Sequence, residues 1–233
     1  MNRSIPLKIF FILRGKSTFW QSSESVISPF SNQTVSIKVH FMLEARHITF
    51  APLFSDLSFS LRQKETLLVR GANGAGKSTF LRILAGLIRL KPNPLFWKGE
   101  AVHLSTYQQN LLYVGHKLAL HPEALLKDQI KLWQYHTGVK RDTIEKALDL
   151  WGVASLFNKK IDQLSQGQRK RISLSRCQWL PRPLWILDEP HTSLDEAGLK
   201  VLEKALCDHR EKGGLVILAT HEKKPKGTQE ILL

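Results

Sequence analysis

Four short runs of apolar residues predict buried strands in this chain, at residues 65–71, 111–115, 184–190 and 215–221. Continuous apolar runs of about four to eight residues are typical of strands that are covered on both faces. After the first run, apolar residues recur at the spacing i, i+3, i+4, i+7 and i+8. They are Phe80, Ile83, Leu84, Leu87 and Ile88. This period places them on one face of an amphipathic helix, so a strand, a loop and a helix follow one another.

A helical subdomain is predicted between about residues 108 and 180. Within it, Asp142 and Glu145 have the spacing of a capping box in which both members are acids. The apolar residues that follow form one stripe, at Ile144, Ala147, Leu148 and Trp151. A further helix is expected after Asp195. Its apolar face consists of Leu199, Leu202 and Leu206. We expect both faces to pack in the core.

Residues 1–41 differ from the rest of the chain, because Ser, Thr and Asn are common and no helical or strand period is sustained. The apolar run at residues 9–13 is followed by Arg14 and Lys16, whereas a secretory signal needs about 7–15 apolar residues and a small-residue cleavage site. Patterned sequence begins at Met42. We therefore predict that Met42 is the natural start, that residues 1–41 are a non-native or disordered extension, and that residues 42–233 form one domain.

Composition narrows the classes of protein to consider. The chain has 233 residues, 42% of them hydrophobic, which is enough to bury a sizeable core. No apolar run reaches the roughly 18 residues that cross a bilayer. Cys177 and Cys207 have no paired spacing, which excludes a disulfide framework and a four-cysteine zinc site. The net charge of +14 is spread along the chain without interleaved aromatics, so we expect no nucleic acid partner, and the charge suits an anionic membrane surface.

The first predicted strand runs into a glycine-rich loop that fits G-x-x-x-x-G-K-[ST], the Walker A motif. Its residues are Gly71, Ala72, Asn73, Gly74, Ala75, Gly76, Lys77, Ser78 and Thr79. The glycines let backbone N–H groups turn towards phosphate oxygens, and the N-terminus of the next helix favours an anion. Lys77 is expected to reach the β- and γ-phosphates, and Ser78 to bind Mg²⁺. A chance glycine-rich turn is the alternative, which the complete strand–loop–helix context disfavours.

The third predicted strand ends in two acids, as a Walker B strand does. Asp188 is expected to hold Mg²⁺ beside the phosphate loop. Glu189 is then placed to act as a general base towards a water in line with the γ-phosphate. The alternative is a solvated acidic pair at a strand end, which would be favoured if no Walker A motif preceded it.

A second helix is expected to start after the segment Leu164, Ser165, Gln166, Gly167 and Gln168, with Ser165 as its N-cap. The order Leu-Ser-x-Gly-Gln, basic helix, Walker B resembles the signature of ABC-type ATPases. Ser193-Leu194-Asp195 matches the D-loop of that family, and His221, at the end of the last strand, matches its switch histidine. The resemblance covers about residues 43–221. It implies a P-loop α/β fold with a mixed sheet core and an inserted helical subdomain, and ATP and Mg²⁺ as cofactors.

In the ABC family, the signature of one copy contacts the γ-phosphate held by the Walker A loop of another copy. The resemblance therefore implies an ATP-dependent pair of chains, arranged head to tail, with two ATP molecules at the interface. Donor groups around Ser165 and Gly167 would bind phosphate in trans at a helix N-terminus. His221 would orient the γ-phosphate and water, and Asp195 would relay across the interface. This chemistry is positioning and charge stabilisation rather than covalent catalysis.

Two positions depart from the family pattern. Most members carry Gln after the strand at residues 111–115, whereas this chain has His116. A neutral imidazole can still bind a γ-oxygen or Mg²⁺-bound water, so His116 is a candidate catalytic residue, with a surface histidine as the alternative. The segment that usually supplies an aromatic to stack on adenine is short, and Phe50 is its nearest candidate.

Several strings together resemble one subfamily, the ATP-binding subunit of the cytochrome c maturation exporter, or haem exporter ATPase. They are residues 42–46, 109–116, 164–168 and 184–190, and the Gly115-His116 pair is the most discriminating. This resemblance implies separate membrane-spanning subunits, a peripheral position on the cytoplasmic face of the bacterial inner membrane, and ATP turnover linked to release of a haem-loaded chaperone. No haem motif is present in the chain, so direct haem binding is not expected. Two alternatives are an ATPase subunit of another ABC exporter and a non-transport ABC ATPase such as an iron–sulfur assembly factor.

Overall fold

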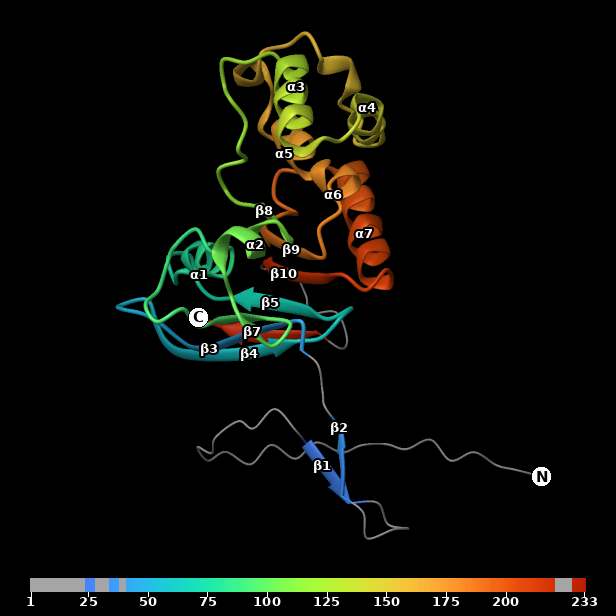
Figure 1. The fold of residues 1–233 in the computed structure, drawn as a ribbon. Coiled ribbons are helices and arrows are strands. Elements are labelled where there is room, and N and C mark those ends of the chain that lie inside the picture. Colours follow the sequence, from blue (N-terminus) through green and yellow to red (C-terminus); the bar gives the residue numbers. More distant parts are fainter. Residues whose placement is uncertain (1–23, 28–33, 38–40, 221–227) are drawn as a thin grey trace, which may run out of the picture. The chain divides into compact units, whose positions relative to one another are not determined.

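The computed structural model describes residues 24–27, 34–37, 41–220 and 228–233 (Figure 1). The chain divides into two units, Met1–Val39 and His40–Leu233. In the first unit, β1 (Glu24–Ile27) pairs with β2 (Thr34–Ile37) in antiparallel fashion, although the sequence pattern predicts no regular element there. The other described helices and strands belong to the second unit, which also carries the glycine-rich loop, the two acids and the predicted signature. A start at Met42 stays a prediction.

The core of the second unit is a five-stranded parallel sheet in the order β11-β5-β10-β9-β8. Its strands are β5 (Thr66–Arg70), β8 (Leu111–Val114), β9 (Leu184–Asp188), β10 (Leu215–Ala219) and β11 (Gln229–Leu232). The four strands predicted from apolar runs are thus confirmed as β5, β8, β9 and β10. They are parallel neighbours, which explains why their sequences are apolar throughout rather than alternating.

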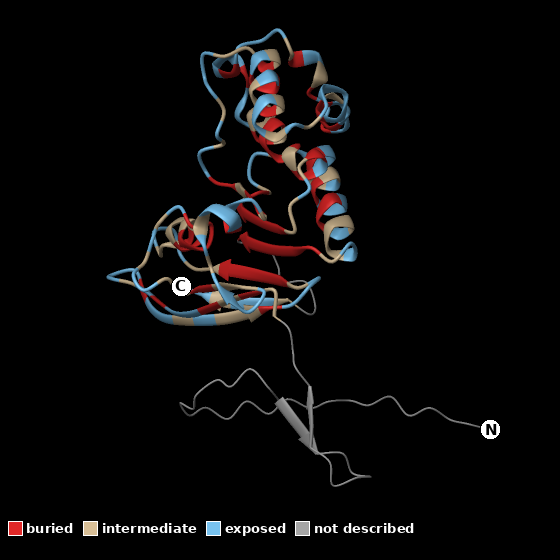
Figure 2. Cartoon of the chain, viewed as in Figure 1, coloured by how far each residue is buried: buried red, intermediate tan, exposed pale blue. Residues whose placement is uncertain are grey.

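Two clusters of buried apolar residues cover the two faces of the parallel sheet. Alternate residues along its central strands belong to different clusters. In β9, Leu184 and Ile186 face the cluster that includes the buried face of α1 (Lys77–Leu84). Trp185 and Leu187 face the opposite cluster, to which α7 (Glu196–Glu211) contributes. Figure 2 shows β9 and β10 as buried along their length, whereas the edge strand β11 is largely exposed. Burial on both faces fixes the register of the strands and therefore the positions of their carboxyl ends.

A second, antiparallel sheet covers the face of the unit on the α1 side, in the order β4-β3-β6-β7. Its strands are β3 (Leu43–Phe50), β4 (Phe54–Leu61), β6 (Leu95–Trp97) and β7 (Glu100–Ala101). The short helix α2 (Leu104–Gln108) follows. The predicted mixed sheet core therefore consists of one parallel and one antiparallel sheet.

The helical part of the unit follows β8 in the chain. It comprises α3 (Leu126–Thr137), α4 (Arg141–Leu150), η1 (Ala154–Leu156), η2 (Ile161–Gln163), α5 (Gln166–Leu174) and α6 (Arg176–Trp179). In Figure 1, α3 and α4 lie together at one end of the unit, and α5 leads back to the parallel sheet. The predicted apolar stripe of α4 is confirmed as buried. Its members are Ile144, Ala147, Leu148 and Trp151.

Two local predictions about helix ends are wrong. Asp142 is not an N-cap, because α4 begins at Arg141 with Lys140 as its N-cap, and Glu145 pairs instead with Arg141 at 2.6 Å. The helix after the glycine-rich loop is also shorter than its period predicts. It ends at Leu84, and Leu87 is 56% exposed, because Gly86 turns the chain away at a φ of 68°.

Candidate functional site

Parallel strands bring the predicted site residues to one edge of the sheet. The glycine-rich loop follows β5, Asp188 ends β9 with Glu189 next to it, Thr220 follows β10, and His116 comes shortly after β8. The register places Ala219 of β10 beside both Val69 of β5 and Asp188 of β9. The carboxyl edge of a parallel sheet is where ligands bind in folds of this kind. Residues far apart in sequence therefore meet at one end of the sheet.

Two glycines of the loop have backbone conformations that disfavour a side chain, and at the first of them a Cβ atom would also clash with backbone. A Cβ atom on Gly71 would lie 2.6 Å from the carbonyl oxygen of Leu233, and the φ of Gly71 is 149°. Gly76 has a φ of 100°, and its Cβ atom would lie 3.1 Å from the side chain of Leu53. Gly76 is also the N-cap of α1, so the loop reaches the helix N-terminus in a conformation that favours glycine. Backbone N–H groups and the helix dipole then face the same space.

Lys77 lies beneath this loop, with its side chain buried. Its Nζ donates to the carbonyl oxygen of Gly71 at 2.9 Å and to that of Ala72 at 3.2 Å. The ammonium group is thus held at the start of the loop, within reach of an anion bound there. Ser78 and Thr79 follow in the first turn of α1 and are half-buried.

Asp188 fits a cation site. It ends β9 and is 3% exposed, and among the residues that the structure describes its Oδ2 atom has no hydrogen-bond partner. A buried carboxylate oxygen without a partner is costly unless a cation or a donor satisfies it. A carboxylate oxygen and a hydroxyl oxygen such as that of Ser78 are both hard ligands of the kind that Mg²⁺ prefers.

Glu189 follows in a left-handed backbone conformation, with a φ of 46°. Its N–H group donates to the carbonyl oxygen of Ala219 at 3.0 Å. Its own carbonyl oxygen accepts from Thr192 Oγ1 at 2.8 Å and from Lys170 Nζ at 2.8 Å. The backbone that carries this carboxylate is therefore held from three directions.

The predicted signature segment forms the start of α5. Ser165 is confirmed as the N-cap, since its Oγ accepts from the N–H group of Gln168 at 3.2 Å. Gln168 Oε1 in turn accepts from the N–H group of Ser165 at 3.0 Å, which completes a capping box. Leu164 is buried before the cap, and Gln166 is exposed. A Cβ atom on Gly167 would lie 2.7 Å from the carbonyl oxygen of Ser193, so the signature and the D-loop of one chain touch.

Asp195 begins α7. Its Oδ1 accepts from the N–H group of Gly198 at 2.8 Å and pairs with Arg171 of α5. The hydrogen bond from Gly198, followed by that from Arg171, lowers the pKa of this carboxyl below its usual value. The side chain therefore both caps a helix and joins the D-loop to α5.

His116 is exposed and lines a cavity of about 600 Å³ beside the start of α5. Gln166, Lys170 and Ser193 line the same cavity. His221 lies outside the described residues. Phe50 is half-buried, with its ring 6.2 Å from that of Phe54.

Sequence reasoning missed two residues that lie near the acids. Lys170 donates to backbone carbonyls at the end of β9, yet a lysine in a basic helix gives no sign of a buried contact. Tyr113 of β8 is hydrogen-bonded to Arg82, and burial raises the pKa of its phenol, with the charge of Asp188 acting in the same direction. Its position in an apolar run indicated only a strand.

The fold and the site together define an ATP-binding domain of the ABC type. The profile of the ABC transporter family matches residues 54–192, and the chain belongs to this family. It is an ABC-type ATPase. Among curated proteins, it is similar to the cytochrome c biogenesis ATP-binding export protein CcmA of several bacteria, which confirms the narrower resemblance.

The relatives cover most of the chain. Identity is 39% to the Escherichia coli K12 protein and 37% to the Aliivibrio fischeri protein, each over 188 residues and 78% of this chain. These alignments cover 89% and 92% of the respective relatives. The corresponding protein of Paramagnetospirillum magneticum is 38% identical over 87% of its length.

Solved structures agree with the fold. An ABC transporter ATP-binding protein from Pyrococcus furiosus has a TM-score of 0.68 at 20% identity, and the match covers 82% of this chain and 96% of that one. A dimeric ATP-binding cassette in a post-hydrolysis state, bound to ADP and Pi, has a TM-score of 0.62 at 19% identity, over 78% and 88%. No helix in the described part of the chain is long and apolar enough to cross a membrane.

Proposed function

We propose that this chain is the ATP-hydrolysing subunit of a cytochrome c maturation complex and couples ATP turnover to release of a haem-loaded chaperone. The observation that supports this most strongly is the 37–39% identity to cytochrome c biogenesis ATP-binding export proteins over nearly their whole length. The chain would act with separate membrane-spanning subunits, at the cytoplasmic face of a bacterial inner membrane. We expect it not to bind haem itself.

Within this proposal, two copies of the chain enclose two ATP molecules. The Gly71–Thr79 loop of one copy holds the phosphates, with Lys77 at the β- and γ-phosphates. The start of α5 in the other copy, at Ser165 and Gly167, supplies donors at a helix N-terminus to the same γ-phosphate. The exposed position of Ser165 supports this arrangement, because its surroundings leave room for a ligand.

Asp188 and Ser78 would hold Mg²⁺, which when bound neutralises charge on the phosphates. Glu189 would accept a proton from the attacking water while the water oxygen bonds to the γ-phosphorus and the bond to the leaving ADP oxygen breaks. His221 and His116 would orient the γ-phosphate and the water. Asp195, held by Arg171, would relay the state of one site to the other.

Replacement of Lys77 tests the proposed function in cells. In a strain that lacks the gene for this chain, we expect the wild-type chain to restore c-type cytochromes and Lys77→Ala to restore none, because ATP binding is lost. Haem staining of separated proteins measures c-type cytochromes, and b-type cytochromes serve as an internal control. Lys204→Met, an exposed change on α7, is the matched variant and should behave as wild type. Full restoration by Lys77→Ala would contradict the proposal.

A further inference from the structure

Lys170 is a buried lysine on α5, five residues after the N-cap of the signature helix, and is 5% exposed. Its Nζ donates to the carbonyl oxygen of Asp188 at 3.2 Å and to that of Glu189 at 2.8 Å. These are the last residue of β9 and the residue after it. One ammonium group therefore joins the signature helix to the backbone that carries both acids.

The backbone at Glu189 needs such support. A φ of 46° is a left-handed conformation that residues with a Cβ atom adopt at a cost, and strain of this kind persists only where surrounding contacts hold it. The N–H group of Glu189 is held by Ala219, and its carbonyl oxygen is held by Thr192 and Lys170. Of these partners, only Lys170 comes from α5, and Thr192 lies in the same turn as Glu189.

Lysine is an unusual choice for this position. Burial lowers the pKa of its amine, which the charges of Asp188 and Glu189 oppose by raising it. A buried cation is costly unless it is paired and hydrogen-bonded, so a neutral residue would be easier to accommodate if only packing mattered. The described contacts of the ammonium group are both carbonyls at the acidic strand end.

We propose that Lys170 is a positioning residue for ATP hydrolysis: it fixes the left-handed backbone of Glu189 and thereby aims the Glu189 carboxylate at the attacking water. Lys170 does not touch the nucleotide in this account. It acts through Glu189, and it makes the placement of the base depend on the position of the signature helix. This inference rests on the proposed role of Glu189.

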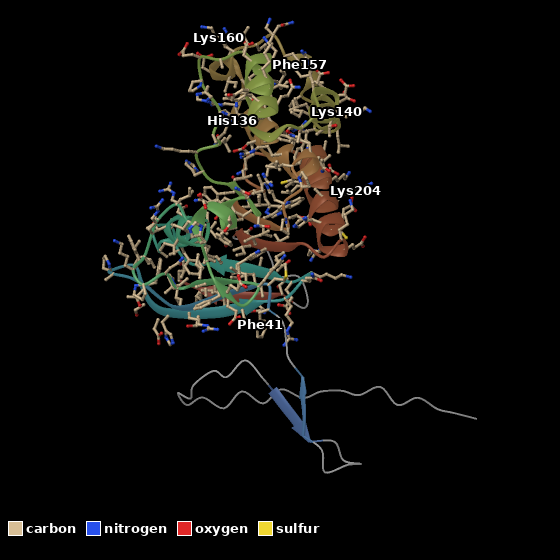
Figure 3. All side chains as sticks on the ribbon, viewed as in Figure 1. Phe41, His136, Lys140, Phe157, Lys160 and Lys204 are labelled. Atoms are coloured by element: carbon tan, nitrogen blue, oxygen red, sulfur yellow. The ribbon has the colours of Figure 1, made fainter. Side chains whose placement is uncertain are left out.

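The test compares steady-state ATP hydrolysis and nucleotide affinity in Lys170→Met, which keeps the length of the side chain but removes the donor. We expect kcat to fall by about 10- to 100-fold, as for a small misplacement of a reacting group. KM and the affinity for a fluorescent ATP analogue should stay within about twofold. Lys170→Arg keeps a charged donor and should recover most of kcat. Lys204→Met removes an exposed lysine from α7 and should leave both constants unchanged (Figure 3).

The roles of Glu189 and Lys170 can be tested separately. Turnover by Glu189→Gln at the wild-type rate would contradict the proposed role of Glu189. No turnover by Glu189→Gln, combined with a wild-type kcat for Lys170→Met, would overturn only the role of Lys170. A rise in KM at unchanged kcat would also overturn it, since that pattern reports loss of binding. If Lys170→Met does not fold, Lys170→Gln, which is polar but too short to reach both carbonyls, decides the question by the same measurements.

Discussion

At the scale of single residues, the site depends on close approaches of backbone to backbone. Gly167 is the clearest case, because a Cβ atom there would lie 2.7 Å from the carbonyl oxygen of Ser193. Carbon and oxygen atoms do not approach so closely, and neither partner is a flexible side-chain end. A substitution at this position must therefore displace the signature, the D-loop or both.

We predict that Gly167→Ala lowers ATP turnover at least about tenfold, because the displaced signature no longer meets the γ-phosphate bound by another copy. Binding of ATP to the chain's own phosphate loop should change less than about twofold, since Gly71 and Lys77 are untouched. Phosphate release and fluorescence titration with a nucleotide analogue measure the two effects. Equal losses of binding and turnover would show that the signature does not act in trans.

At the scale of elements, the helices and strands differ in how well their sequences determine them. The apolar runs predict β9 and β10 correctly, because a short run of residues that is buried on both faces is typical of a parallel strand. The start of α4 does not follow from its sequence. Asp142 offers a capping side chain, yet the N-cap lies two residues earlier, at Lys140. Packing of the apolar stripe on the core decides the helix start, and the cap is left without a side-chain acceptor.

That unfilled cap predicts a stabilising change. Lys140→Ser should raise the free energy of unfolding by about 0.5–2 kcal/mol, because the serine oxygen can accept from an N–H group in the first turn and a cation is removed from the helix N-terminus. Lys140 is exposed and labelled in Figure 3. Urea unfolding measures the change. Lys146→Ser, an exposed change within the same helix, should instead cost up to about 0.5 kcal/mol, and equal effects of the two variants would contradict the capping argument.

Much of the site could be predicted from the sequence, because its motifs are local. The phosphate loop, Asp188 and the Ser165 cap each follow from residues within a few positions of one another. The contacts that join them could not be predicted. Lys170 meets the carbonyl of Glu189 19 positions away, and the sequence gives no sign that this lysine is buried. Likewise, the helical period of apolar residues includes Leu87, but the helix ends at Leu84 and the chain turns at Gly86, which leaves Leu87 exposed.

At the scale of the whole molecule, one chain carries one phosphate loop and one signature. The phosphate loop lies at the carboxyl edge of the parallel sheet, and the signature lies at the start of α5. Within the chain, the signature is joined to the acids through Lys170 and to the D-loop through Arg171. In the proposed pair, the helix that each chain presents to the ATP of the other chain is therefore also the helix that contacts its own two acids.

The mass of Glu189→Gln in solution, with and without Mg²⁺ and ATP, tests this account most directly. We predict the mass of one chain without nucleotide and twice that mass with it, since bound ATP persists when the base is absent. Adding Gly167→Ala to the same chain should return the mass to that of a single chain, although ATP stays bound. Two results would contradict a site shared between two copies. One is that Glu189→Gln keeps the mass of one chain when it is saturated with ATP, and the other is that the pair persists when Gly167→Ala is added.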